Sequence, residues 1–162
     1  MGYTAGGMKE REKKLEALGY TLEKVTSPVA IYEPIVIDGT TVYASGSIPV
    51  DDGQLISKGK VPSQVSLKDA QKAAGLCVAN ILRIVYSKFG SLDKIERVLR
   101  LSGYVNSDID FTDQHLVVNG ASQLLIDVFG DAGRHARSAV GVAQLPLGSS
   151  VEIELILKLK KR

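Results

Sequence analysis

Hydrophobic and polar residues alternate along the last part of the chain with a period of two. One set is Val151, Ile153, Leu155, Leu157 and Leu159, and the other is Glu152, Glu154, Ile156, Lys158 and Lys160. Successive side chains of a strand point to opposite faces, so this pattern predicts a strand over residues 150–160 with one buried face. Other short runs that are rich in apolar residues predict four further strands, over residues 29–37, 41–45, 95–106 and 136–143.

Two longer segments carry apolar residues at the spacing of an α-helix. The first is predicted to run from its cap, Ser66, to about Phe89 and to end at Gly90. The second is expected over residues 111–129, closed by Gly130. Both segments are long enough to cover a sheet.

The order of these elements predicts the fold class. Asp38 and Gly39 form a strong hairpin signal between the first two strands, and residues 47–64 are loop-rich, with a short strand expected near Leu55. The resulting order β-β-α-β-α-β-β predicts an α+β fold: a mixed sheet with both helices on one face. Because apolar residues occupy both faces of the strands, self-association through the uncovered face is expected.

The N-terminal part is set apart by its composition. Residues 1–7 show no periodicity and are expected to be a frayed tail or a non-native remnant. A short surface helix rich in Lys and Glu is predicted over residues 8–18, with Gly19 as its stop. We therefore divide the chain into an N-terminal tail and helix, residues 1–19, and one domain, residues 20–162.

Overall composition narrows the function classes. The 162 residues carry a net charge of +2, too mild to indicate nucleic-acid binding. No apolar run approaches the ~20 residues of a membrane helix, and the N-terminus resembles no signal peptide, so a cytoplasmic location is expected. The single cysteine, Cys77, fits a reducing compartment, and two scattered histidines, His115 and His135, make no metal-binding pattern. Neither a metal nor an organic cofactor is predicted.

The candidate chemistry begins with an arginine inside a strand of small apolar residues. Arg137 lies in the run Ala136-Arg137-Ser138-Ala139-Val140-Gly141-Val142. A guanidinium in such surroundings is expected to pair with a carboxylate, in the protein or in a ligand. Its planar group can donate two parallel hydrogen bonds to one carboxylate. Downstream, Glu152 can accept a proton or orient a water. This pair suits hydrolysis of a small substrate that bears a carboxylate.

Three segments together resemble a known family. Residues 136–146 (ARSAVGVAQLP), together with Val151-Glu152-Ile153-Glu154, resemble the C-terminal signature of the YjgF/RidA family, labelled endoribonuclease L-PSP in older usage. Residues 43–50 (YASGSIPV) resemble its Ser-Gly-x-Ile-Pro segment. The resemblance implies a chorismate-mutase-like fold, a homotrimer, and ligand sites in the clefts between subunits. It also implies hydrolysis of enamine and imine intermediates, such as 2-aminoacrylate, to 2-keto acids and ammonia.

Residue by residue, the resemblance implies a catalytic pair and a cleft lining. Arg137 would bind the carboxylate of a 2-imino or 2-keto acid, and Glu152 would orient or activate the attacking water. The residues that would line the cleft are Tyr32, Ser45 and Gly46.

Three features depart from the best-known members of the family. Ala139 stands where those members have a cysteine, and Ile109 where they have a cleft asparagine. Residues 111–123 span about one extra helical turn. These departures, with the additional N-terminal residues, indicate a divergent, longer subgroup.

Alternatives remain open at this level. Arg137 can be structural, and Glu154 can replace Glu152 as the active carboxylate. A non-catalytic, trimeric protein that binds small carboxylates is the main rival to a deaminase, and an endoribonuclease is less favoured. If residues 144–150 form a plain hairpin loop, Glu152 lies near the turn and Arg137 lies roughly 17 Å away along the strand. The two would then meet across a subunit boundary or through curvature of the sheet.

Overall fold

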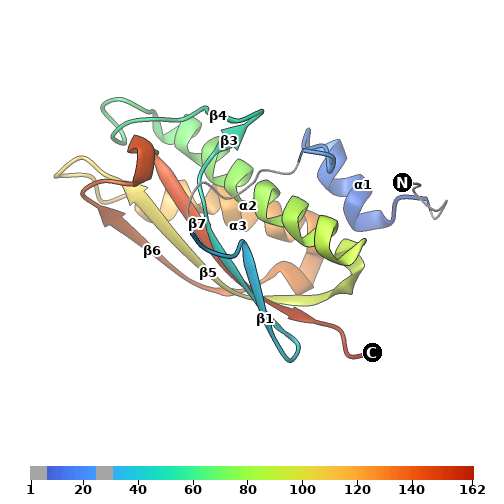
Figure 1. Ribbon diagram of the computed structural model, residues 1–162. Coiled ribbons are helices and arrows are strands. Elements are labelled where there is room, and N and C mark those ends of the chain that lie inside the picture. Colours follow the sequence, from blue (N-terminus) through green and yellow to red (C-terminus); the bar gives the residue numbers. More distant parts are fainter. Residues whose placement is uncertain (1–6, 25–30) are drawn as a thin grey trace.

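A layer of helices lies on one side of a twisted sheet in the computed structural model, which describes residues 7–24 and 31–162 (Figure 1). The main sheet has the order β1-β2-β7-β5-β6. Its strands are β1 (Ile35–Asp38), β2 (Thr41–Ser47), β5 (Ile95–Asn106), β6 (Ala136–Val142) and β7 (Val151–Leu159). The helices are α1 (Glu10–Ala17), α2 (Leu67–Phe89) and α3 (Gln114–Phe129). A small ribbon pairs β3 (Val50–Asp51) with β4 (Gln54–Leu55), and short 3-10 turns are η1 (Leu92–Lys94), η2 (Gly130–Gly133) and η3 (Pro146–Gly148). The predicted α+β class is confirmed.

The alternation along β7 has the predicted meaning. Val151, Ile153, Leu155 and Leu157 are at most 1% exposed and form part of the core under the helices. The residues between them are only half-buried, because they lie on the face of the sheet opposite α2 and α3, which we call the open face. On the covered side α2 and α3 approach closely, since a Cβ on Gly120 would lie 2.1 Å from the backbone oxygen of Gln71.

Two predicted boundaries are wrong. The first strand was expected over residues 29–37, but residues 31–34 lie outside the ladder and residues 29 and 30 lie outside the described residues. The second helix begins at Gln114, three residues later than expected, because the amide of Phe111 closes a turn onto the carbonyl of Asp108. The first helical bonds are accepted by the carbonyl of Asp113.

The last two strands do not form a hairpin, because β5 lies between them. It pairs in parallel with β6 on one side and antiparallel with β7 on the other. Since α3 carries the chain from β5 to β6, that connection is a crossover, which makes the two strands parallel. The chain then returns through η3 to pair with the other side of β5. β6 is therefore an edge strand and β7 is central.

Helix α1 is docked on the domain by buried polar contacts. Glu12 is 2% exposed, and its carboxylate accepts hydrogen bonds from the Ser91 hydroxyl at 3.0 Å and the Leu92 amide at 2.7 Å. Arg11 donates to the carbonyls of Leu92 and Ile95, and its guanidinium stacks 4.7 Å from the centroid of the Phe129 ring. The charged residues of this helix thus fix it to the turn at η1.

In the described residues, α2 is the longest helix, with 23 residues. None of the helices in residues 7–24 and 31–162 has the length and sustained apolar character of a transmembrane segment.

Candidate functional site

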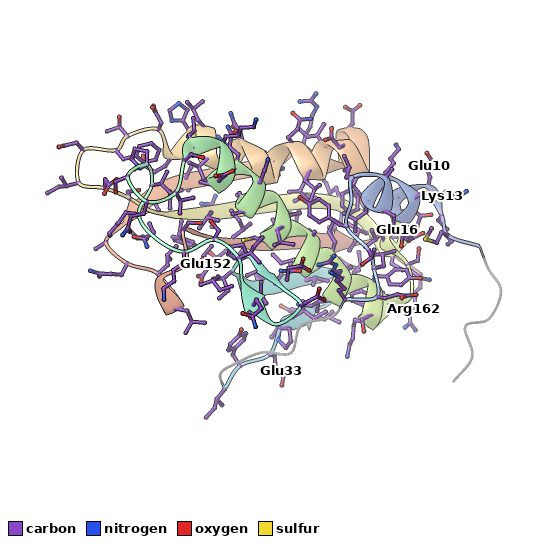
Figure 2. All side chains as sticks on the ribbon, turned by 90° about the horizontal axis from the view of Figure 1, so that it is seen from above. Glu10, Lys13, Glu16, Glu33, Glu152 and Arg162 are labelled. Atoms are coloured by element: carbon purple, nitrogen blue, oxygen red, sulfur yellow. The ribbon has the colours of Figure 1, made fainter. Side chains whose placement is uncertain are left out.

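Glu152 lies on the open face of the central strand β7, directly over the backbone of Gly46 in β2. A Cβ on Gly46 would lie 2.7 Å from Oε2 of Glu152 and 2.9 Å from its Cδ, so the absence of a side chain at Gly46 leaves room for this carboxylate. On its other side Glu152 is the cross-strand partner of Tyr104 in β5. In Figure 2, which views the molecule from above, Glu152 lies well inside the molecular outline.

An irregularity in the β2–β7 ladder lies opposite Glu154, at the Ser-Gly segment whose Gly46 backbone faces the side chain of Glu152. Ala44 pairs with Leu155 and Ser47 pairs with Ile153, so two residues of β2 oppose one residue of β7. This is the geometry of a β-bulge, which frequently re-aims side chains beside functional sites. The two residues of the bulge, between the paired residues Ala44 and Ser47, are Ser45 and Gly46.

The carboxylate of Glu152 lies in an environment that favours its neutral form. Partial burial raises the pKa of Glu152, and the charge of Glu154 two residues along the strand raises it further. The Tyr104 hydroxyl donates to Oε1 of Glu154 at 2.9 Å. This bond raises the pKa of Tyr104, as does partial burial. A raised pKa brings this half-buried carboxyl closer to neutral pH than an exposed glutamate, which suits a group that accepts and returns protons.

The segment before β1 is tied to the same site. The Ser45 hydroxyl donates to the carbonyl of Glu33 at 2.6 Å, and the Ser45 amide donates to the carbonyl of Pro34 at 2.9 Å. Tyr32 immediately precedes these acceptors and is 44% exposed. Figure 2 places Glu33 at the periphery, on the chain leading into β1. The structure therefore brings Gly46 and Glu152 together, with Ser45 next to Gly46, and Tyr32 adjoins Glu33, whose carbonyl accepts the hydrogen bond from Ser45.

Arg137 lies elsewhere, on the helix side of the edge strand β6. It is level with Leu101, a fully buried residue of β5, and its guanidinium contacts α3. Nη1 donates to Oγ of Ser122 at 3.0 Å, and Nη2 donates to the carbonyl of His115 at 3.0 Å. Arg137 makes no ion pair with any of the described residues, so its charge has no carboxylate partner among them.

A chain of hydrogen bonds orients the guanidinium of Arg137. Nδ1 of His135 lies 2.6 Å from the carbonyl of Gly133, and its Nε2 lies 2.9 Å from Oγ of Ser122. A carbonyl only accepts, so Nδ1 carries the proton, and in the neutral ring Nε2 accepts from Ser122. The Ser122 oxygen is then free to accept from Arg137. Ser122 and Tyr104 were missed at the sequence level, because only the fold brings them to these partners.

Arg137 and Glu152 do not meet within one chain. Glu152 is level with Tyr104, which is level with Val140, three residues beyond Arg137. Two strand spacings separate them by about 10 Å across the sheet, and three residues add about 10 Å along it. They also lie on opposite faces. The distance expected between Arg137 and Glu152 assumed that residues 144–150 form a hairpin loop. That assumption is wrong, because β5 lies between β6 and β7.

The two departures from the family pattern fall in different surroundings. Ala139 packs partly against the core on the same side of β6 as Arg137. Ile109 is 99% exposed in the loop before α3. For metal chemistry, the described residues contain no group of three His, Cys, Asp or Glu side chains that could hold an ion, and Cys77 is fully buried.

Comparison with known proteins identifies the family. The model described as "YjgF/chorismate_mutase-like, putative endoribonuclease" matches residues 12–159. This chain belongs to the YjgF family.

Three relatives cover nearly the whole domain. "Protein TCP17" of Trypanosoma cruzi is 38% identical over 146 residues, which is 90% of this chain and 91% of that protein. The crystal structure of Atu1372 from Agrobacterium tumefaciens, described as of unknown function, is 45% identical, covers 93% of this chain and 92% of its own, and superposes with a TM-score of 0.85. A crystal structure from Shewanella oneidensis, described as a "putative endoribonuclease", is 29% identical, covers 93% of this chain and all of its own, and has a TM-score of 0.88.

Proposed function

We propose that this YjgF-family protein hydrolyses reactive enamine and imine intermediates of the 2-aminoacrylate class to 2-keto acids and ammonia. The working unit is a homotrimer, and each site combines Glu152 of one subunit with Arg137 of its neighbour. Tyr32, Ser45 and Gly46 line the cleft on the Glu152 side. No metal or organic cofactor takes part in this scheme.

The single observation that carries the proposal is the separation of two complementary half-sites. Glu152 is a half-buried carboxylate with a raised pKa, held over Gly46 without an arginine. Arg137 is oriented by Ser122 and the carbonyl of His115, without a carboxylate. A guanidinium that has no carboxylate partner among the described residues is available to a ligand, and β6 is an edge strand, which a neighbouring subunit can approach.

Self-association has a surface that supports it. A row of apolar side chains crosses the open face from β1 through β2 to β7, where Val36 pairs with Tyr43 and Tyr43 pairs with Ile156. Val36 is 53% exposed and Tyr43 is 46% exposed in the single chain. Exposed apolar rows of this kind are typical of protein–protein interfaces, so we expect this face to be buried against other subunits. Homo-oligomers usually have closed symmetry.

The chemistry needs only positioning and proton transfer. Arg137 fixes the substrate carboxylate so that the imine carbon faces a water beside Glu152. The substrate reacts as the iminium ion. As the water adds to its carbon, Glu152 accepts one proton from the water, and a neutral carbinolamine forms. Glu152 then returns that proton to the nitrogen, the carbon–nitrogen bond breaks, and the hydroxyl proton passes to Glu152 as the keto group forms and ammonia leaves. General acid–base help of this kind contributes typically about 10²–10⁴-fold, and fixed geometry contributes further.

The test is release of pyruvate and ammonia from freshly generated 2-aminoacrylate, measured against the rate without protein. We expect the purified protein to accelerate release, and RNA incubated with it to stay intact with and without divalent ions. Binding of pyruvate without acceleration would replace the deaminase with a carboxylate-binding protein. Cleavage of RNA would favour the endoribonuclease instead.

A further inference from the structure

A cavity lies on the helix side of the sheet, and Glu152 is not among the residues that line it. It has a volume of about 560 Å³, within the size range of small-ligand sites. Its walls come from α2, from the β3–β4 ribbon and the loop that follows it, and from residues 19–24 after α1. Figure 1 shows the ribbon and the chain after α1 beside α2, above the sheet. The site proposed above uses none of these residues.

The innermost polar group of this cavity is Arg83 of α2. The residue is 3% exposed, and its guanidinium is fixed by Nε donating to the carbonyl of Thr21 at 2.6 Å and Nη1 donating to Oδ1 of Asn80 at 2.8 Å. Nη2 makes no hydrogen bond with a described residue, although Arg83 lines the cavity. Burial lowers the pKa of Arg83, so an anion beside it would relieve a cost that the fold carries.

Other donors converge on the same space without partners. The Tyr20 hydroxyl, the Gln64 amide nitrogen and the ammonium groups of Lys58 and Lys72 line the cavity, and none of them bonds to a described residue. Partial burial raises the pKa of Tyr20, which keeps its hydroxyl a donor. A cavity rich in unused donors is complementary to a ligand rich in acceptor oxygens.

The charge of the lining indicates the kind of anion. Four cationic side chains and two carboxylates line the cavity, a net charge of +2. One of the cations, Lys24, is engaged at 3.1 Å and 3.0 Å by Asp51 and Asp52, whereas Lys58, Lys72 and Arg83 make no ion pair among the described residues. A phosphomonoester carries about −1.5 to −2 charges and three strong acceptor oxygens. A carboxylate offers one charge and two oxygens. The apolar part of the wall is Ile56, Val65, Ala73 and Leu76.

We infer that this cavity binds a small organic phosphomonoester, with the phosphoryl group beside Tyr20 and Arg83 and an apolar body against the aliphatic wall. The site is independent of the deaminase proposal, because it shares no residue with it and lies on the side of the sheet opposite Glu152. Its ligand would be held by charge-assisted hydrogen bonds to a preorganised arginine and by exposed lysines at the rim.

The test is calorimetric titration of the full-length protein with four probes: phenyl phosphate, inorganic phosphate, benzoate and benzyl alcohol. We expect phenyl phosphate to bind once per chain, and inorganic phosphate and benzoate to bind at least about tenfold more weakly. Benzyl alcohol, which lacks the anion, should not bind measurably. Equal affinity for benzoate, or absence of saturable binding of phenyl phosphate, would overturn the inference.

Substitutions at Tyr20 and Lys72 test binding without disturbing the fold, because Tyr20 is half-buried and Lys72 is exposed. Tyr20→Phe should weaken phenyl phosphate binding by about fivefold or more, through loss of one donor, and Lys72→Gln should weaken it by a smaller factor, through loss of one charge at the rim. Lys68→Gln is the matched control, because Lys68 lies on the same helix but outside the cavity. This variant should bind phenyl phosphate with the affinity of the wild-type protein. Arg83→Lys, checked for folding by circular dichroism, should weaken binding further, since lysine lacks the planar fork. Unchanged affinity in both Lys72→Gln and Tyr20→Phe would contradict this site.

Discussion

The surroundings of Glu152 and those of Arg137 are built in opposite ways. Glu152 sits at the centre of the sheet, where a glycine, a β-bulge and a second carboxylate hold it half-buried with a raised pKa. Arg137 sits on the edge strand, on the other face, oriented by neutral oxygen acceptors. Each lacks the group that the other supplies. Two residues that resemble parts of one motif along the sequence are thus separated by the sheet, and the function that we propose joins them across two subunits.

The largest expected effect is on the Glu152 side. Glutamine keeps the shape of the side chain and its contact with Gly46 but cannot take a proton. Glu152→Gln should therefore lower kcat for keto-acid release by about 10²–10⁴-fold, while pyruvate binding through Arg137 persists. Coupled assay and calorimetry on the same preparation measure both quantities.

Glu154→Gln is the matched control for that change, because its amide oxygen can still accept from Tyr104. It should leave most of the turnover in place. If Glu154→Gln were the inactive variant and Glu152→Gln the active one, the assignment of the water-activating carboxylate would be reversed.

Arg137→Lys tests the other half of the comparison. Lysine keeps the charge but replaces a two-point contact with a single point charge, so the substrate loses its fixed orientation. We expect kcat/KM to fall by about 10²-fold, the loss that misplacement of a reacting group typically causes, with assembly unchanged in light scattering. Full keto-acid production by this variant would make the arginine structural.

Gly46→Ala tests whether the space above Gly46 positions the carboxylate of Glu152. The added Cβ would lie 2.7 Å from Oε2 of Glu152, so the carboxylate must move while the strand remains. We expect roughly a tenfold loss of kcat. In the Glu152→Gln background the same change should add little, because two changes that act on one group are not additive. Additive losses would mean that Gly46 acts independently of Glu152.

The smallest effect concerns stability. Because burial and Glu154 raise the pKa of Glu152 in the folded protein, the folded state binds more protons than the unfolded state in the window just above the ordinary glutamate range. Stability should fall as pH rises through that window. Glu152→Gln removes this penalty, so its Tm should exceed that of wild type at neutral pH and the difference should vanish in acid. A lower Tm at neutral pH would show that ionised Glu152 stabilises the fold.

Much of the fold could be read from periodicity. The alternation of β7, the cap at Ser66 and the left-handed end at Gly90 are local signals, and each is confirmed. The placement of β5 between β6 and β7 was not predictable in this way. The turn residues before Gly148 resemble a hairpin, whereas strand order depends on how the crossover through α3 packs.

The site was predictable only in part, for the same reason. The Ser-Gly segment and Glu152 do come together, because β2 and β7 are neighbours. No sequence pattern indicated that Tyr104 bonds Glu154, or that Ser122 lies between His135 and Arg137, since these contacts join segments through the tertiary fold. The small residues near Arg137 indicated space, but not which face of the strand it occupies.

The central claim is that one site takes Arg137 from one subunit and Glu152 from another, and mixing two inactive variants tests it most directly. Arg137→Lys and Glu152→Gln subunits are co-refolded in equal amounts, and keto-acid release is compared with each variant alone and with wild type. In a cyclic trimer every mixed assembly retains one boundary with both native residues, so about a quarter of the wild-type activity should return. Activity that stays at the level of the separate variants would contradict a shared site between subunits.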